Sequence, residues 1–272
     1  MISVQNRIFA PLENEEMNLE FYKYQGTGND FVMIDNRSNT FKKGSTEIIS
    51  HLADRHFGVG ADGIILIEND ENLDFKMIYF NADGSQTFCG NGARCAIAFA
   101  KKLGIITAQT TFSAVDGEHV AEIKNGIVSL QMIDVNEIQV NENSVFMYTG
   151  TQHHVEMVTD LNEYPVFSNG KKIRDSYTDP GSNVNFVQQI NATTFRVRTY
   201  EKGVENETLA CGTGVTAVAI GMHKINKTKS NLITLPVEGG ILEVSFTEKN
   251  GTYKNVFLKG PATFVFKGEI TI

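Results

Sequence analysis

Two short stretches with the same signature decide the fold of this chain: Cys-Gly-Asn-Gly at residues 89–92 and Cys-Gly-Thr-Gly at residues 211–214. Each begins a run of small apolar residues, 93–100 and 215–220, which predicts a buried helix with no strongly polar side. A cysteine at the first turn of such a helix lies beside backbone N–H groups that lack a helical partner, and these donors favour the thiolate. Two such elements predict a site built from a pair of facing thiols.

The two signatures belong to a longer internal repeat. They lie 122 residues apart, and four other motifs recur in the same order at offsets of 122 to 125 residues. These pairs are Tyr24-x-Gly26-Thr27 with Tyr148-x-Gly150-Thr151, Gly58-x-x-x-Asp62 with Gly181-x-x-x-Asn185, Val115-Asp116-Gly117 with Val237-Glu238-Gly239, and Asn125-Gly126 with Asn250-Gly251. Because the chain has 24 glycines, one match has little weight, but the shared order indicates a duplication.

The repeat and the strand signals predict an α+β fold of two pseudo-symmetric domains. Each half contains several short strands and one long buried helix, so we expect a curved, mainly antiparallel sheet wrapped round a central helix. We place the N-terminal repeat domain at residues 17–138 and the C-terminal repeat domain at residues 139–261. Residues 1–16 show no clear periodicity, and we expect a disordered leader there, with Met17 as the functional start.

Composition narrows the class of protein. The net charge of −8 and the pI near 5.3 argue against a general nucleic-acid binder, which carries a basic face. No apolar run approaches the ~20 residues that span a bilayer. The three cysteines form an odd number and show no zinc-ligand spacing, so we expect free thiols, no metal and a cytoplasmic location. A small molecule is the expected partner, with neither nucleic acid nor membrane.

A pseudo-twofold fold places equivalent residues opposite one another where the halves meet. Cys89 and Cys211 would then face each other, one as thiolate and one as thiol. This geometry suits the removal of a proton from one face of a carbon and the delivery of a proton to the other face, which is stereoinversion. Backbone N–H groups at the two helix starts are placed to stabilise a carbanion next to a carboxylate. A simpler interpretation is that Cys89 and Cys211 are ordinary core thiols. The flanking glycines and the repeat symmetry argue against that interpretation.

At these residues the sequence resembles the cofactor-independent diaminopimelate epimerases. Five segments carry the resemblance, which runs over residues 19–270: Gly-Thr-Gly-Asn-Asp-Phe at 26–31, Arg-His-Phe-Gly-Val-Gly-Ala-Asp at 55–62, Asn-Ala-Asp-Gly at 81–84, Cys-Gly-Asn-Gly-Ala-Arg-Cys at 89–95 and Glu-Thr-Leu-Ala-Cys-Gly-Thr-Gly at 207–214. The resemblance implies interconversion of LL- and meso-diaminopimelate in lysine biosynthesis without a cofactor such as PLP. It also implies a homodimer, and a last strand, about residues 262–272, that returns to the first domain.

The resemblance also implies roles for particular residues. Cys89 and Cys211 match the two catalytic bases, and His153 and Glu201 match side chains that tune the site. The residues that match substrate-binding positions are Asn29, Asn81, Gly90, Asn91, Asn183, Glu201, Lys202, Gly212 and Thr213. Lys202 stands where the family commonly has Arg, so the charge is kept but the bidentate fork is lost.

Two other functions fit the same residues. One is a related cofactor-independent racemase or isomerase of the same fold that acts on another amino acid. The other is a non-catalytic paralogue, or a thiol–disulfide redox protein that uses Cys89 and Cys211.

We expect Cys95 to be a small core residue, because it lies about 240° round the helix from Cys89.

Overall fold

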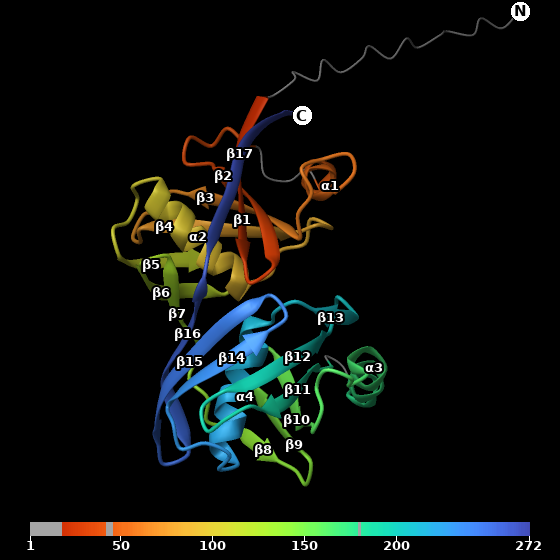
Figure 1. The fold of residues 1–272 in the computed structure, drawn as a ribbon. Helices are drawn as coiled ribbons and strands as arrows, with labels where there is room; N and C mark the ends of the chain where they lie inside the picture. The colour runs from red at the N-terminus through yellow and green to blue at the C-terminus, as the bar shows by residue number, and fades with distance from the viewer. Residues whose placement is uncertain (1–17, 42–45, 179–180) are drawn as a thin grey trace, which may run out of the picture.

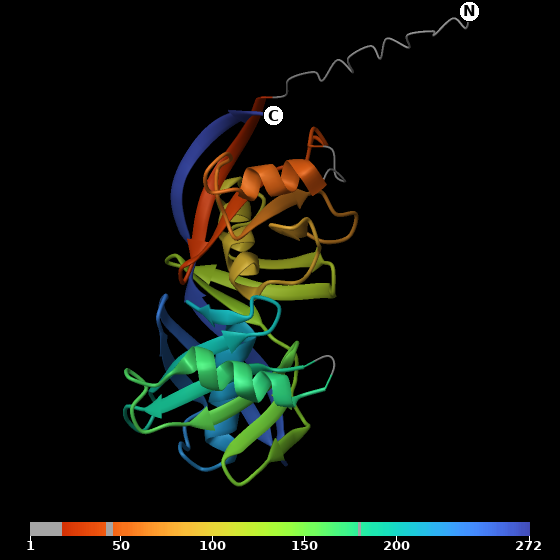
Figure 2. The same cartoon turned by 90° about the vertical axis from the view of Figure 1, so that its right-hand side faces the viewer.

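The computed structural model describes residues 18–41, 46–178 and 181–272, so the leader expected at residues 1–16 lies outside it. The chain forms two bodies, one above the other in Figures 1 and 2, and each encloses one long helix. These helices are α2 (Gly90–Lys102) and α4 (Gly212–Lys224), which begin at the two Cys-Gly signatures as predicted. Two further helices, α1 (Thr46–Ala53) and α3 (Val166–Ser176), lie on the outside and were not predicted from the sequence.

The larger sheet runs through both bodies. Among the described residues it has eleven strands in the order β14-β15-β16-β7-β6-β5-β4-β3-β2-β1-β17. The strand bounds are β1 (Asn18–Gly26), β2 (Asn29–Asp35), β3 (Gly63–Glu68), β4 (Phe75–Asn81), β5 (Gln109–Ala114), β6 (Gly117–Lys124), β7 (Ile127–Gln131), β14 (Leu232–Val237), β15 (Gly240–Lys249), β16 (Thr252–Pro261) and β17 (Thr263–Thr271). Neighbouring strands are antiparallel except for β2 with β3 and β4 with β5.

The smaller sheet lies in the lower body of Figure 1. Over the described residues it has six strands in the order β13-β12-β11-β10-β9-β8. Their bounds are β8 (Ile138–Val140), β9 (Ser144–Tyr148), β10 (Gln152–Met157), β11 (Asn183–Gln189), β12 (Phe195–Glu201) and β13 (Asn206–Thr208). Only β10 and β11 are parallel neighbours here, so the described sheets are mainly antiparallel, as predicted.

Strand pairing repeats between the halves. The parallel pair β2 and β3 has its counterpart in β10 and β11, and the antiparallel pair β3 and β4 has its counterpart in β11 and β12. The parallel pairing of β4 with β5 is reduced in the second half to one bridge, Thr194 with Thr234. Helices α2 and α4 begin 122 residues apart, at Gly90 and Gly212. The predicted fold class is therefore confirmed, while the domain bounds stay a prediction.

The two halves are joined by their sheets as well as by the chain. Strand β16 pairs with β7, which makes the large sheet continuous across the junction. After the single residue Ala262, β17 continues into the upper body and pairs antiparallel with β1 along its length (Figure 1). A hydrogen bond from Thr271 Oγ1 to Asn18 Oδ1 closes the far end of this pair at 2.7 Å. The sequence predicted one curved sheet in each half, but not that the larger sheet would contain strands of both halves.

Helix α2 departs from the predicted apolar character because Arg94 is fully buried in it. Its guanidinium donates to Thr27 Oγ1 at 2.9 Å, and its Nε donates to the Pro261 carbonyl at 3.4 Å. These partners belong to the β1–β2 turn and to the end of β16. A helix with no strongly polar side was therefore the wrong expectation, because α2 contains a buried guanidinium. Its Nε and Nη2 find partners at the junction, whereas its Nη1 has no hydrogen-bond partner among the described residues.

Two glycine-to-alanine substitutions should have opposite effects on stability. A Cβ at Gly239 would lie 1.8 Å from the Thr27 carbonyl oxygen, so the β14–β15 turn and the β1–β2 turn must move apart. We expect Gly239→Ala to lower the free energy of unfolding by about 1–3 kcal/mol. A Cβ at Gly221 in α4 meets Met147 at 3.5 Å, an ordinary contact, so Gly221→Ala should raise it by about 0.5–1 kcal/mol. Urea unfolding of both variants measures this, and changes of the same sign would contradict the packing described here.

Candidate active site

The two cysteines occupy equivalent backbone positions. Cys89 precedes α2 with φ −127° and ψ 112°, and Cys211 precedes α4 with φ −119° and ψ 111°. Neither side chain caps its own helix, so both thiols remain available for other partners. Cys89 is partly exposed, Cys211 is buried, and both are free thiols.

Contacts across the junction bring the two helix starts together. Asn91 Nδ2, in the first turn of α2, donates to the carbonyl of Ala210 at 3.1 Å, immediately before Cys211. A Cβ added at Gly90 or Gly212 would in each case meet Leu258 of β16 first, at 3.9 Å and 2.9 Å. The two signatures, 122 residues apart in sequence, therefore approach the same leucine side chain.

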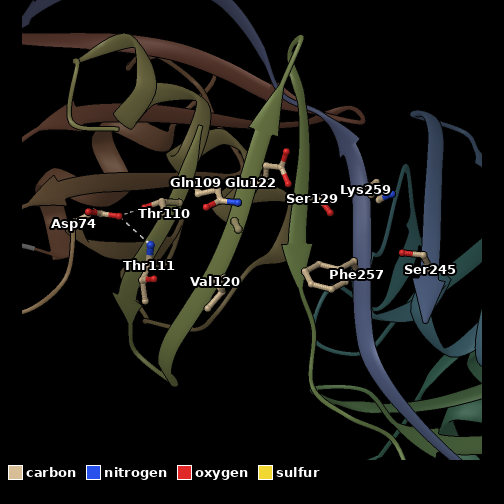
Figure 3. Close-up of a pocket in the computed structure, with 11 residues that line it drawn as sticks. Asp74, Gln109, Thr110, Thr111, Val120, Glu122, Ser129, Ser245, Phe257 and Lys259 are labelled. Atoms are coloured by element: carbon tan, nitrogen blue, oxygen red, sulfur yellow. Dashed lines mark hydrogen bonds between the residues drawn. The ribbon is translucent and has the colours of Figure 1, made fainter. Parts of the chain in front are cut away.

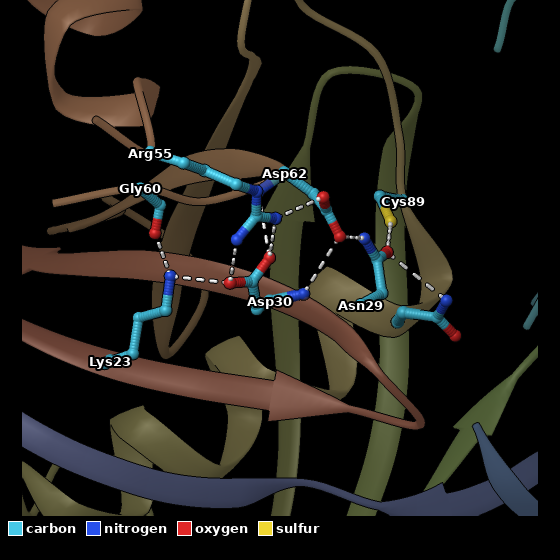
Figure 4. Close-up of polar contacts among 8 residues, drawn as sticks. Lys23, Asn29, Asp30, Arg55, Gly60, Asp62 and Cys89 are labelled. Carbon is cyan, nitrogen blue, oxygen red and sulfur yellow. Dashed lines mark hydrogen bonds and ion pairs between the residues drawn. The ribbon is translucent and has the colours of Figure 1, made fainter. Parts of the chain in front are cut away.

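Cys89 lies at the end of a polar network in the first half (Figure 4). Its thiol donates to Asn29 Oδ1 at 3.5 Å, and the amide of Asn91 donates to the same oxygen at 3.3 Å. Asn29 Nδ2 donates in turn to the carboxylate of Asp62 at 2.5 Å. The carbonyl oxygen of the Asn91 side chain is buried and has no partner among the described residues, so it is free to accept a hydrogen bond from a substrate.

Charged side chains stand behind Asn29 in this network. Arg55 donates to Asp62 at 2.8 Å and makes two hydrogen bonds to Asp30, at 2.7 Å and 3.0 Å. Lys23 forms an ion pair with Asp30 at 2.8 Å and donates to the carbonyl of Gly60. Two carboxylates and two cations therefore fix residues 55–62, which lead into β3, against β1 and β2 (Figure 4).

Cys211 lies beside a second network in the lower body. Its sulfur is 3.5 Å from Thr213 Oγ1, which lies 2.9 Å from His153 Nε2. Asn185 Nδ2 donates to His153 Nδ1 at 3.1 Å and to the carbonyl of His154 at 2.9 Å. Burial, with a contribution from the charge of Lys202, lowers the pKa of His153 to about 3, so the ring is neutral. Because Nδ1 accepts from Asn185, the ring proton is on Nε2.

Glu201, at the end of β12, is the acidic group nearest Cys211. It accepts a hydrogen bond from Thr208 Oγ1 at 2.5 Å, and its charge contributes to raising the pKa of the Cys211 thiol. Burial nevertheless raises the pKa of Glu201. Asn183 pairs with His153 across the parallel strands β10 and β11, and its side chain accepts from the backbone N–H of Lys202 at 2.8 Å.

The pKa of both thiols is raised, which differs from the sequence-based expectation for the helix starts. Burial raises the pKa of Cys89 to about 11, against the opposing effect of the N–H groups of Gly92 and Asn91. Burial and then the Glu201 carboxylate raise the pKa of Cys211, against Thr213 and the N–H of Gly214. Helix N–H donors act as predicted, but the loss of water around sulfur outweighs them.

Not every predicted site residue directs its side chain towards the two cysteines. Asn81 uses its side chain within its own loop, where Nδ2 donates to Ser85 Oγ at 3.0 Å and Thr87 Oγ1 at 3.2 Å, and Oδ1 accepts from Tyr79 at 2.9 Å. Asn185 and Asp62 were not predicted as site residues, although the repeat matched them to each other. Cys95 is fully buried in the core, as expected.

A surface hollow of about 570 Å³ lies away from this constellation, on the outer face of the large sheet (Figure 3). It extends over β5, β6, β7, β16 and β15, and none of the predicted site residues lines it. Asp74 at one end accepts hydrogen bonds from Thr110 Oγ1 at 2.9 Å and from the backbone of Thr111 at 3.0 Å.

Within residues 18–41, 46–178 and 181–272 no group of three or more His, Cys, Asp or Glu side chains is placed to hold a metal. No helix in these ranges is long and apolar enough to cross a membrane.

Comparison with known structures defines the class of protein first. A phenazine biosynthesis protein of the PhzF family from Bacillus anthracis superimposes with a TM-score of 0.76 at 13% identity, covering 94% of this chain and 100% of that one. A hydroxyproline epimerase from Agrobacterium vitis gives a TM-score of 0.68 at 14% identity, covering 94% and 93%. The chain therefore has the two-domain fold of these proteins. In this chain a Cys-Gly turn lies at the start of each central helix.

Sequence comparison then specifies the family. The model described as diaminopimelate epimerase matches the chain twice, at residues 21–144 and 145–265. The diaminopimelate epimerase of Flavobacterium psychrophilum is 56% identical over 256 residues, covering 93% of this chain and 100% of the relative. That of Aquifex aeolicus is 38% identical over 278 residues, covering 93% and 98%. The chain belongs to the diaminopimelate epimerase family, which confirms the predicted family and the prediction of an isomerase.

Acid should weaken the network around Asp30. Burial alone would raise the pKa of Asp30, but Arg55 and Lys23 prevail and lower it to about 2. Since the pKa in an unfolded chain is about 3.9, this stabilisation is complete above about pH 4 and is lost as the pH falls towards 2. We expect Asp30→Asn to lower the free energy of unfolding by about 1 kcal/mol at pH 5, allowing for solvent screening, and by less at pH 2.5. Urea unfolding over this range tests it, and a difference independent of pH would contradict it.

Proposed function

We propose that the protein interconverts LL- and meso-diaminopimelate in lysine biosynthesis, with Cys89 and Cys211 as its two acid–base groups. The observation that carries the proposal is the meeting of the two Cys-Gly helix starts around Leu258 in a member of this family. Stereoinversion needs one group on each face of the reacting carbon, and the approach of the two Cys-Gly helix starts to the same leucine supports such a pair.

The proposed reaction moves one proton in and one proton out. A thiolate on one face takes the α-proton, so an S–H bond forms and the C–H electron pair stays on the α-carbon. The thiol on the opposite face then donates its proton to that carbon and becomes the thiolate. Because the first sulfur gains what the second loses, the protein ends with the same number of protons and needs no redox partner.

The carbanion requires stabilisation, and the helix starts provide donors. The first backbone N–H groups of each helix have no partner within the helix, and those of Gly90, Asn91, Gly212 and Thr213 lie in these first turns. One preorganised donor of this kind is worth about 3 kcal/mol in a dry site. We propose that these groups hold the substrate carboxylate at the reacting centre.

Glu201 and His153 are proposed to tune Cys211. Burial raises the pKa of both groups, and the Glu201 carboxylate is the next cause, after burial, that raises the pKa of the Cys211 thiol. When the proton moves from sulfur to the Glu201 carboxylate, Cys211 becomes the thiolate. His153 stays neutral and acts through Thr213.

The remaining side chains of the resemblance are proposed to bind the substrate. Asn29 and Asn91 lie beside Cys89, and Asn183 and Lys202 lie on the strands next to His153. Asn81 would have to leave its loop partners to join them. A cytoplasmic homodimer that works without PLP is proposed from the family resemblance alone.

Purified protein incubated with LL-diaminopimelate in deuterated water, without added cofactor, should incorporate deuterium at the α-carbon and yield the meso isomer. Mass spectrometry and chiral separation measure the two events. Exchange with inversion of another amino acid instead would favour a related racemase. Absence of exchange, with a reversible disulfide between Cys89 and Cys211 at a physiological potential, would refute the epimerase and favour a redox protein.

Serine at either catalytic position should abolish most turnover. We expect Cys89→Ser and Cys211→Ser each to lower kcat by about 10²–10⁴-fold, because a hydroxyl is a much weaker acid–base group than a thiol. Cys95→Ala is the matched control, since Cys95 is buried in the core behind α2, and it should retain turnover. Circular dichroism establishes that each variant is folded. Wild-type turnover in either serine variant would remove that thiol from the mechanism.

A further inference from the structure

The two cysteines are each supported by a chain of hydrogen bonds, and these chains are equivalent in the repeat. In the first half, Asp62 contacts Asn29 and Asn29 contacts Cys89. In the second half, Asn185 contacts His153, which reaches Cys211 through Thr213. Asn185 is the repeat partner of Asp62, and His153 lies three residues after Gly150 as Asn29 lies three residues after Gly26.

The hydrogen-bond polarity of the first chain is fixed by Asp62. An ionised carboxylate accepts hydrogen bonds and donates none, so the NH₂ group of Asn29 must point towards Asp62. The carbonyl oxygen of Asn29 is then turned towards Cys89, 3.5 Å from its sulfur. Arg55 and the backbone N–H of Asp30 hold the Asp62 carboxylate in this position, at 2.8 Å and 3.2 Å. Cys89 therefore meets an acceptor, which favours the protonated thiol.

The polarity of the second chain is the reverse. The carbonyl of His154 accepts and cannot donate, so the NH₂ group of Asn185 points towards it and towards His153 Nδ1. Thr199 Oγ1 donates to the other end of the Asn185 amide at 3.0 Å. His153 must then carry its proton on Nε2 and donate to Thr213, which leaves the threonine hydroxyl hydrogen free for Cys211. Thr213 can therefore act as a donor to Cys211, which opposes the burial and the Glu201 carboxylate that raise the pKa of this thiol.

We propose that Asp62 and Asn185 are positioning residues of opposite polarity: Asp62 turns the carbonyl of Asn29 towards Cys89 and favours its protonated thiol, whereas Asn185 fixes the ring proton of His153 so that Thr213 directs its hydroxyl hydrogen at Cys211. Neither Asp62 nor Asn185 contacts a sulfur; each acts through the side chain in front of it. The inference rests on the proposed function, because the two sulfurs have these roles only in the proposed acid–base reaction. Its first two tests use no substrate.

Other charges face the two sulfurs and must stay unchanged in any test. The groups that influence Cys89 are Glu201, the buried Arg94 and the phenol of Tyr79. Those that influence Cys211 are Glu201 and Cys89 itself. Substitution of Asp62 or Asn185 leaves all of them in place. Because Asp62→Asn also removes a negative charge near Cys89, the same substitution with Asn29→Ala separates the hydrogen-bond chain from that charge.

Alkylation of Cys89 tests the first chain without turnover. In a Cys211→Ser background, Asp62→Asn frees the Asn29 amide to turn its NH₂ group to sulfur, so the rate of iodoacetamide alkylation at pH 7 should rise about three- to tenfold, the equivalent of one hydrogen bond. Asp35→Asn is the matched control. Asp35, the last residue of β2, also pairs with an arginine, Arg37, but lies about 20 Å along the strand from Asn29. An unchanged rate in Asp62→Asn, or an equal rise in Asp35→Asn, would overturn the role of Asp62.

The ¹⁵N NMR signals of the imidazole test the second chain in the unaltered protein. We expect His153 as the neutral tautomer with its proton on Nε2 between pH 6 and 8, and a mixture of tautomers in Asn185→Ala. A proton on Nδ1 in the unaltered protein would overturn the role of Asn185, whether or not the variant folds.

Kinetics then separate positioning from stability. Asp62→Asn should lower kcat/KM about 10–100-fold in the unaltered protein, but less than about threefold when Asn29 is already Ala, because its effect passes through Asn29. Additive losses would mean that Asp62 acts through structure alone. Absence of turnover in the unaltered protein would instead refute the proposed function, while the alkylation and NMR results would still stand by themselves.

Discussion

The meeting of two helix starts at the junction of the halves is the constraint on which the rest depends. A thiol at the start of one helix has nothing to act with unless its counterpart is brought to the same place. Leu258 lies near both Gly90 and Gly212, and a side chain at residue 212 would push against it, so the glycine at 212 allows this close approach. Asn91 then fastens the first turn of α2 to the residue before Cys211. The continuous pairing of β7 with β16 holds the two bodies in this relation.

The electrostatics of the site follow from its burial. Water around sulfur stabilises a thiolate more than a few backbone dipoles do, so closing the two halves around the thiols raises the pKa of both. Polar side chains around the thiols partly replace this water, and their orientations are fixed by neighbouring groups. The carbonyl of His154 orients Asn185, and the carboxylate of Asp62 orients Asn29. A site of this kind stores little charge at rest and relies on proton transfer between adjacent groups.

What could be predicted from the sequence was local in origin. The Asn-Gly turns at residues 125–126 and 250–251 need positive φ at both positions, which the structure has, and the Cys-Gly helix starts follow from the same kind of local preference. Arg94 could not be predicted as buried, because its partners Thr27 and Pro261 are distant in sequence and known only from the fold. The repeat paired Asp62 with Asn185, but their opposite hydrogen-bond polarity depends on the groups around them. Helices α1 and α3 were missed as short surface elements whose position is set by the sheets they cover.

Strand β17 has a consequence for how the molecule is made. Its partner β1 begins at Asn18, and the last bond of the pair joins Asn18 to Thr271, across 253 positions of sequence. During synthesis the upper body therefore presents an open sheet edge until the final segment leaves the ribosome, although all its other strands have been available since Gln131. Contacts of such sequence separation form slowly, and an unpaired edge is the feature that invites wrong pairing. The half that is translated first is thus the half that is finished last.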